Sequence, residues 1–267
     1  MMGEVRAVPA TTISRAAFDA VLFDLDGVLT DTALLHRSAW ARLVEQELGG
    51  APLTAVEYAA RVDGRRREDG VRALMETRRV PVSDAAVGAL ARAKDGYFLE
   101  LLDRNGPRLL SGGLRLVHAV RGAGMGCAVV SASRNCEQVL RRAGFGELFD
   151  VRVDGVVADE LALPGKPHPA TYLEAARRLG VEPHRAVVVE DAVAGVVAGR
   201  GGGFGMVLGV DRRGEGDGLR CAGADAVVAD LSAVRVVTVD ADPDGRPLDP
   251  GGAEPAGVAW DVDPPAT

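Results

Sequence analysis

Two aspartates separated by one residue are the clearest chemical signal in this sequence. Asp24 and Asp26 follow the apolar run Ala20–Phe23, and Gly27 comes next. Ligands of open α/β sheets bind outside the carboxyl ends of the strands, so both carboxylates would face such a crevice, and glycine lets the chain turn sharply after them. An ordinary polar turn is the alternative. A calcium-binding loop fits less well, because Val28 stands where that loop has its third ligand and the terminal Glu is missing.

A second acidic pair, Glu190 and Asp191, follows the apolar run at 186–189. Two acidic pairs brought together at strand ends would repel each other strongly, and a divalent cation would remove that conflict. Mg²⁺ prefers oxygen ligands and keeps water molecules for a phosphate substrate. For this pair by itself, helix capping is an equal alternative, because Asp191 precedes an apolar, helix-like stretch. The two pairs together favour a metal site.

A hydroxyl-rich turn and a lysine in a proline-flanked loop add possible phosphate contacts. Ser131 and Ser133 follow the apolar run at 128–130, and hydroxyl and backbone N–H groups at a helix start can bind an anion. Lys166 lies between glycine and proline, and its ammonium group is a compact charge that suits a phosphate. Each feature alone is weak, since serines often cap helices and surface lysines are common.

These residues need a scaffold that brings the ends of several strands together. Continuous apolar runs recur along the chain with helix-like stretches between them, which indicates strands buried on both faces of a parallel sheet. We therefore predict a doubly wound, Rossmann-like α/β fold. The predicted strands lie at 20–23, 127–130, 186–189, 206–210 and 226–229, and the predicted helices at 114–121, 137–143, 170–179 and 192–198.

The segment 34–108 differs from the rest, because it is rich in Ala, Leu, Arg and Glu and its apolar residues recur at helical spacing. We predict a helical cap domain inserted after the first strand, above the mouth of the sheet. The core domain would comprise 16–33 and 109–232. The remaining segment, 233–267, is rich in Pro, Gly and Asp, and we expect a disordered or loosely attached tail.

Composition narrows the class of protein. The net charge of −7 argues against a nucleic-acid-binding protein. The sequence has no uncharged apolar stretch of about 20 residues and no recognisable signal peptide, so we expect a cytoplasmic protein that makes no membrane contact. Three cysteines without a C-x-x-C pair argue against a disulfide framework and a structural zinc site. We also expect a monomer.

The four motifs in this order resemble those of the haloacid-dehalogenase superfamily, which has DxD after the first strand, Ser after the second, then Lys, and finally an acidic pair. The resemblance extends from Phe18 to Leu231. A closer similarity to the β-phosphoglucomutase-like members, which carry a helical cap after the first motif, is visible in FDLDGVLTDTALLHRSAW, DGRRREDGV, SASRN, GKPHP and VEDAVAG.

The resemblance implies a role for each motif. Asp24 would attack phosphorus and become an aspartyl phosphate, and Asp26 would act as the acid and base. Mg²⁺ would be held by Asp24, the backbone carbonyl of Asp26, Glu190 and Asp191. The transferring phosphoryl group would be held by Ser131, Ala132 and Lys166.

A mutase must also bind a second, non-reacting phosphate. The resemblance assigns this task to Arg67, Ser133, Arg134 and Asn135, and the hinge between cap and core to Thr32 and His36. The family's cap lysine, which contacts sugar hydroxyls, aligns with Ala93 here. Lys94 stands one residue later, which on a helix is a rotation of about 100°. Because that lysine contacts the sugar, the resemblance does not carry over the specificity for a hexose.

Three functions are compatible with these residues. The leading hypothesis is a mutase that interconverts β-glucose 1-phosphate and glucose 6-phosphate, and a cap that closes and excludes water would favour it. The second is a phosphatase that hydrolyses a small sugar phosphate. The third is a non-catalytic binding protein, against which the intact set of Asp24, Asp26, Lys166 and Asp191 argues.

Overall fold

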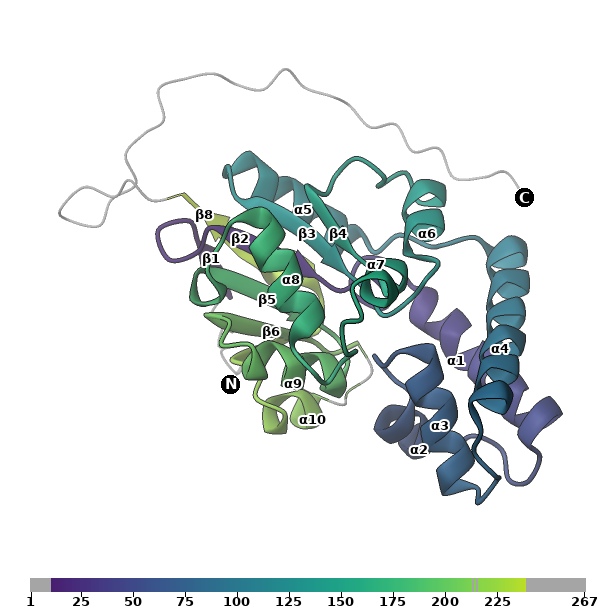
Figure 1. Ribbon diagram of the computed structural model, residues 1–267. Helices are drawn as coiled ribbons and strands as arrows, with labels where there is room; N and C mark the ends of the chain where they lie inside the picture. The colour runs from purple at the N-terminus through teal and green to yellow at the C-terminus, as the bar shows by residue number, and fades with distance from the viewer. Residues whose placement is uncertain (1–10, 213, 215, 239–267) are drawn as a thin grey trace, which may run out of the picture.

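The centre of the molecule is a parallel sheet whose strands follow the order β4-β3-β2-β5-β6-β7 (Figure 1). The computed structural model describes residues 11–212, 214 and 216–238 of the chain. The predicted fold class is confirmed, and each of the predicted strands is present. The sheet is built from β2 (Ala20–Phe23), β3 (Gly126–Val130), β4 (Val151–Val153), β5 (Ala186–Glu190), β6 (Met206–Val210) and β7 (Ala226–Val228).

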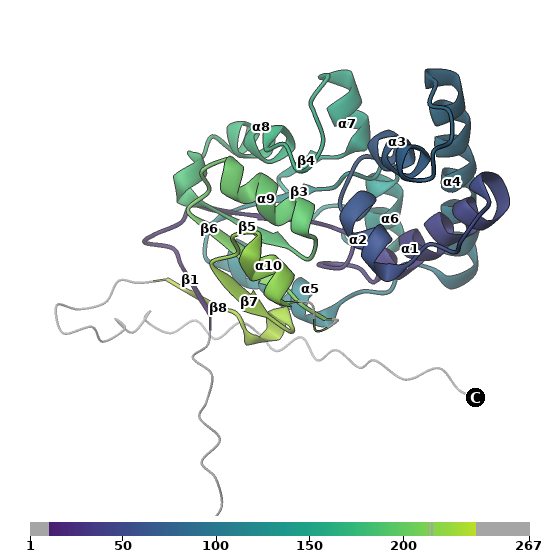
Figure 2. The same ribbon diagram turned by 90° about the horizontal axis from the view of Figure 1, so that it is seen from below.

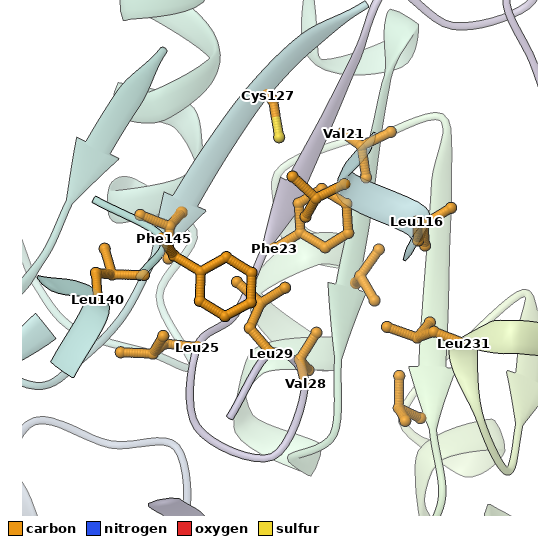
Figure 3. Close-up of a cluster of buried hydrophobic side chains, with 14 of the residues drawn as sticks. Val21, Phe23, Leu25, Val28, Leu29, Leu116, Cys127, Leu140, Phe145 and Leu231 are labelled. Carbon is orange, nitrogen blue, oxygen red and sulfur yellow. The ribbon is translucent and has the colours of Figure 1, made fainter. Parts of the chain in front are cut away.

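Successive residues of the central strands face two separate apolar layers. Val21 and Phe23 of β2 belong to one hydrophobic cluster, and Ala20 and Leu22 belong to the other. Figure 3 shows part of the first layer, to which Phe23 contributes its ring. Because both faces are covered, the strands read as continuous apolar runs. The first face is covered by α5 (Ser111–Gly122) and α6 (Cys136–Arg142), and the second by α8 (Ala170–Leu179) and α9 (Val193–Gly201).

Between β2 and α5 the chain forms a distinct group of helices at one end of the sheet (Figures 1 and 2). They pack around a hydrophobic cluster of their own, which includes Trp40 and Leu74. Phe98 and Leu102 belong instead to the first apolar layer of the core, so the base of this group is joined to the sheet by apolar packing. The group consists of α1 (Thr32–Leu43), the π-helix η1 (Val44–Leu48), α2 (Ala55–Arg61), α3 (Arg67–Thr77) and α4 (Asp84–Asn105).

Several short elements were not predicted. Strand β8 lies inside the segment that we expected to be a loose tail, where it pairs in parallel with β1 and contributes Val236 to the packing around the core. Strands of three residues are too short to show a periodic pattern. The rest of that segment, 239–267, lies outside the described residues. The unpredicted elements are β1 (Thr12–Ser14), β4, α7 (Gly155–Glu160), η2 (Pro183–Arg185), α10 (Gly216–Cys221), η3 (Leu231–Ala233) and β8 (Arg235–Val237).

None of the helices in the described residues combines the length and the apolar character that crossing a bilayer requires.

Candidate active site

A buried ammonium group joins the two acidic motifs. Lys166 Nζ donates to Asp24 Oδ1 at 2.5 Å and to Glu190 Oε1 at 2.6 Å. The two carboxylates come together because β2 and β5 are neighbours in register, with Phe23 opposite Val189. Burial by itself would lower the pKa of Lys166, but the charges of Asp24 and Glu190 outweigh burial and raise it, so the lysine is protonated at neutral pH.

Four donors hold the carboxylate of Glu190. Besides Lys166, Oε1 accepts from the Tyr172 hydroxyl at 2.8 Å, and Oε2 accepts from the backbone N–H groups of Asp191 and Ala192 at 3.1 and 3.0 Å. A side chain at Gly195 would not fit, since its Cβ would lie 1.7 Å from Glu190 Oε1. Tyr172 gave no signal in the sequence, because it reads as one apolar residue of a helix. Glu190 is thus fixed beneath the site as well as contributing charge to it.

The acidic residues fit a divalent cation. Asp24, Glu190 and Asp191 each offer one carboxylate oxygen within 4.8 Å of the others, and oxygen is the donor that Mg²⁺ and Ca²⁺ prefer. Gly27 has a φ of +97°, and a Cβ on it would lie 1.9 Å from Asp191 Oδ2, so this carboxylate requires glycine there. Burial raises the pKa of Asp24, Lys166 lowers it, and Glu190 raises it further, leaving the pKa well above its usual value. A cation between these carboxylates would favour ionised Asp24, the form that can attack phosphorus.

The side chain of Asp26 points toward the helical group rather than toward this acidic cluster. Its Oδ1 accepts from Thr32 Oγ1 at 2.5 Å, and its Oδ2 accepts from Ser131 Oγ at 3.3 Å. His36 Nε2 lies 3.4 Å from Oδ1, and burial together with the charge of Lys94 lowers the pKa of His36. Burial raises the pKa of Asp26, but His36 and Thr32 outweigh it and bring the pKa to about 2. At neutral pH Asp26 is therefore a carboxylate.

Lys94 reaches the site from α4, although the resemblance put Ala93 in the place of the cap lysine. Its Nζ lies 2.6 Å from His36 Nδ1 and faces the rings of Trp40 and Phe98 at 5.3 and 5.1 Å. Ala93 packs against the hydrophobic cluster of the helical group instead. The rotation of α4 thus brings a lysine into the cleft from the next position. Lys94 and Lys166 are the chain's two lysines, and both are buried in this site.

The turn after β3 lies beside Asp26. Ser131 Oγ accepts from the backbone N–H of Ser133 at 3.0 Å, and Ser133 Oγ accepts from the N–H of Asn135 at 3.2 Å. These bonds fix the turn that we predicted to bind phosphate. Ala132 and Ser133 line the same cleft as Asp24.

The residues predicted to bind a second phosphate lie in or beside the same cleft. Three of them form hydrogen bonds or ion pairs with carboxylates. Asp95 Oδ1 lies 2.6 Å from Arg67 Nη1 and accepts from Asn135 Nδ2 at 2.8 Å. Arg134 forms an ion pair with Asp159. Sequence reasoning assigned no role to either aspartate, because each is one acidic residue of an ordinary helix.

The cleft between the two groups of elements has a volume of about 70 Å³, well below the roughly 300–1,000 Å³ of typical ligand pockets. A ligand that needs a pocket of that size could enter only after the helical group had moved away. The cleft is lined by Asp24, Asp26, His36, Trp40, Tyr58, Arg65, Arg67, Lys94, Asp95, Ala132, Ser133, Arg134, Glu190 and Asp191, among others.

Lys94→Met will change how the free energy of unfolding depends on pH. Burial lowers the pKa of Lys94 from 10.5 to about 7 in the folded protein. Between these values the unfolded chain holds a proton that the folded chain does not, so wild-type stability rises with pH, by at most about 1.4 kcal/mol per unit from this group. Urea titrations at pH 6.5, 8 and 9.5 should show that the free energy of unfolding of the variant falls relative to that of the wild type as pH rises. A constant difference would contradict the lowered pKa.

Comparisons with known proteins identify the family to which this fold belongs. A family model described as haloacid dehalogenase-like hydrolase matches residues 18–203. A β-phosphoglucomutase of Mycobacterium bovis is 41% identical over 235 residues, or 80% of this chain and 90% of the relative. A phosphorylated carbohydrates phosphatase of Thermotoga maritima is 34% identical over 79% of this chain and 94% of the relative. The crystal structure of a β-phosphoglucomutase from Clostridium difficile matches with a TM-score of 0.70 and 28% identity, over 80% of this chain and 92% of that one. The chain therefore belongs to the haloacid dehalogenase-like hydrolases and is an enzyme of that type.

Proposed function

We propose that this enzyme is a Mg²⁺-dependent sugar-phosphate mutase that converts β-glucose 1-phosphate into glucose 6-phosphate through an aspartyl phosphate on Asp24. The observation that supports the proposal is that two sets of groups able to bind an anion lie close to the cleft. Lys166 lies beside Asp24, while Arg67 and Asn135 both contact Asp95, and Ser133 lines the cleft. A mutase needs both sets, because its intermediate carries two phosphates, whereas a phosphatase needs only the first. The similarity to the M. bovis β-phosphoglucomutase supports this assignment.

The geometry gives Asp24 and Lys166 distinct tasks. Asp24 would form a bond to phosphorus while the bond between phosphorus and the donor oxygen breaks. Lys166 would hold Asp24 Oδ1 and offset the charge of the incoming phosphoryl group. Mg²⁺ bound by Asp24, Glu190, Asp191 and the backbone carbonyl of Asp26 would supply further positive charge to that group. Ser131 and Ala132 would hold its remaining oxygens.

Asp26 would begin each cycle as a base. With a pKa of about 2 it is ionised at neutral pH, so it can accept the proton of a sugar hydroxyl that attacks the aspartyl phosphate. It then carries the proton that the departing sugar oxygen needs in the second transfer. Thr32 and His36 would keep the carboxylate aimed into the cleft.

Hydrolysis of a small sugar phosphate is the second candidate. The similarity to the T. maritima phosphorylated carbohydrates phosphatase favours it. Both reactions share the aspartyl phosphate and differ in the acceptor, which is a sugar hydroxyl in one case and water in the other. The small, covered cleft supports the mutase, since covering the site excludes water.

Asp24→Asn should reduce turnover about a thousandfold or more, because the amide keeps the shape of the side chain but cannot serve as the nucleophile. The assay supplies β-glucose 1-phosphate, Mg²⁺ and a catalytic amount of the bisphosphate, and measures glucose 6-phosphate, glucose and free phosphate. Glucose 6-phosphate identifies a mutase, and glucose with free phosphate identifies a phosphatase. Asp84→Asn, at an exposed position of α4, is the matched control. Full activity of the Asp24 variant would refute the covalent mechanism.

Arg67→Ala should lower the mutase rate about tenfold or more, because charge-assisted bonds to the second phosphate are lost. Hydrolysis of a small phosphate ester, which has no second phosphate, should change much less. Arg72→Ala is the control, since Arg72 lies exposed on the same helix and pairs with Asp84. Equal losses in both assays would contradict a role for Arg67 at the second phosphate.

A further inference from the structure

We propose that Asp159 is the anchor that holds the cap closed over the site, through an ion pair with Arg66, and is thereby a positioning residue for the reaction. The cap here means the helical group α1–α4. This inference rests on the proposed function only where it concerns water and the fate of the aspartyl phosphate. The closure itself can be tested without any assumption about the reaction.

One carboxylate links the cap to the turn that follows β3. Asp159 lies in α7, and its two oxygens receive one guanidinium each, Oδ1 from Arg66 Nη2 and Oδ2 from Arg134 Nη1. Arg66 belongs to the cap, where it immediately precedes α3. Arg134 belongs to the turn that lines the cleft. Asp159 thus joins both sides of the cleft at a single point.

The side chain of Arg66 lies in close contact with the core. Its Nη1 donates to the backbone carbonyl of Leu163 at 3.3 Å. Its aliphatic part crosses Gly165 so closely that a Cβ there would lie 2.3 Å from Arg66 Cγ. Gly165 directly precedes Lys166, so closing the cap brings Arg66 against the loop that carries the catalytic ammonium group. This close fit makes Arg66 more than a solvated surface arginine.

Helix α7 is fixed where it must present Asp159. The buried side chain of Asp154 accepts from the N–H groups of Val156 and Val157, both at 3.0 Å, and so caps the helix. At Gly155 a Cβ would lie 2.9 Å from the carbonyl oxygen of Ala132, so the helix start packs directly on the phosphate-binding turn. Figure 2 shows α7 on the side of the core that faces α3. The anchor point therefore keeps a set position relative to the site.

Another polar bridge between cap and core involves residues that a bound substrate would contact. Asp95 of α4 accepts from Asn135, and it also holds Arg67. A bound second phosphate would compete for both partners. Arg66 has no such role, so its bridge to Asp159 can stay closed throughout the transfer.

The bridge is of a kind that can open in every cycle. The base of the cap is joined to the core by apolar packing that includes Phe98 and Leu102, whereas α3 meets the core through Arg66. The side chains of Arg66 and Asp159 are 25% and 33% exposed, and ion pairs of this kind shift an equilibrium by about fivefold at most. A weak contact that is separate from the packed base suits a cap that must close for chemistry and open for exchange of sugars.

Loss of the bridge would admit water to the aspartyl phosphate. A water oxygen would then form the bond to phosphorus, the bond to the Asp24 oxygen would break, and Asp26 would take the proton of the water. Inorganic phosphate would leave in place of the phosphorylated sugar. The ratio of hydrolysis to transfer therefore reports on the closure.

The direct test measures how readily the cleft opens. Lys94 of the cap is buried and lines the cleft that the cap closes, and one other lysine exists in the chain, so acetylation by an N-hydroxysuccinimide ester, followed by peptide mass spectrometry, gives a site-specific opening rate. Asp159→Asn and Arg66→Gln should each raise the Lys94 rate about two- to fivefold, and the double variant no further. Asp84→Asn, which breaks an Arg–Asp pair within the cap, should leave the rate unchanged. Unchanged rates in both single variants, or effects that multiply in the double variant, would overturn the anchor.

The second measurement separates the anchor from the proposed function. With β-glucose 1-phosphate and the bisphosphate, both single variants should release more free phosphate per glucose 6-phosphate than the wild type, by a similar factor. Arg66→Gln matters most here, because it leaves the pair between Arg134 and Asp159 intact. A wild type that makes no glucose 6-phosphate would refute the mutase, while the acetylation rates still decide the anchor. Faster acetylation with an unchanged product ratio would overturn the role of Asp159 in excluding water.

Discussion

The ammonium group of Lys166 holds two buried carboxylates together at the carboxyl ends of β2 and β5, and the site is arranged around it. Buried charges are costly unless they are paired and hydrogen-bonded. Lys166 meets that condition through Asp24 and Glu190, and Glu190 is held in addition by Tyr172. Asp24, Glu190 and Asp191 also lie close enough together to hold a divalent cation between their carboxylates.

In the proposed mechanism, the chemistry is divided between the core and the cap. The core would supply Asp24, which directly follows a strand packed on both faces, and Lys166, which is buried beside it. The cap supplies Lys94 and Arg67 from helices with a hydrophobic cluster of their own. Apolar packing at the base of the cap makes a durable joint, and polar contacts at α3 make a reversible one. This division lets one end of the cap move while the catalytic groups stay in place.

Lysine and arginine occupy different kinds of position in this protein. The chain has 31 Lys and Arg residues, yet both lysines are buried in the cleft and the other basic residues are arginines. An ammonium group is a compact charge whose pKa responds to burial, whereas a guanidinium keeps its charge and forms paired contacts with carboxylates. Lys94 illustrates the first property, with its pKa brought to about 7. Arg66 and Arg67 illustrate the second, since each forms an ion pair with an aspartate.

The sequence by itself determined the parallel α/β fold and the acidic motifs, because apolar runs mark strands buried on both faces and the residues that follow them lie at one edge of the sheet. The sequence did not determine whether Ala93 or Lys94 faces the cleft, because that depends on how α4 is rotated against its neighbours. It gave no sign of the link between Arg66 and Asp159, which lie 93 positions apart. Local patterns reveal residues that act within their own element, whereas contacts between cap and core exist only once both have packed.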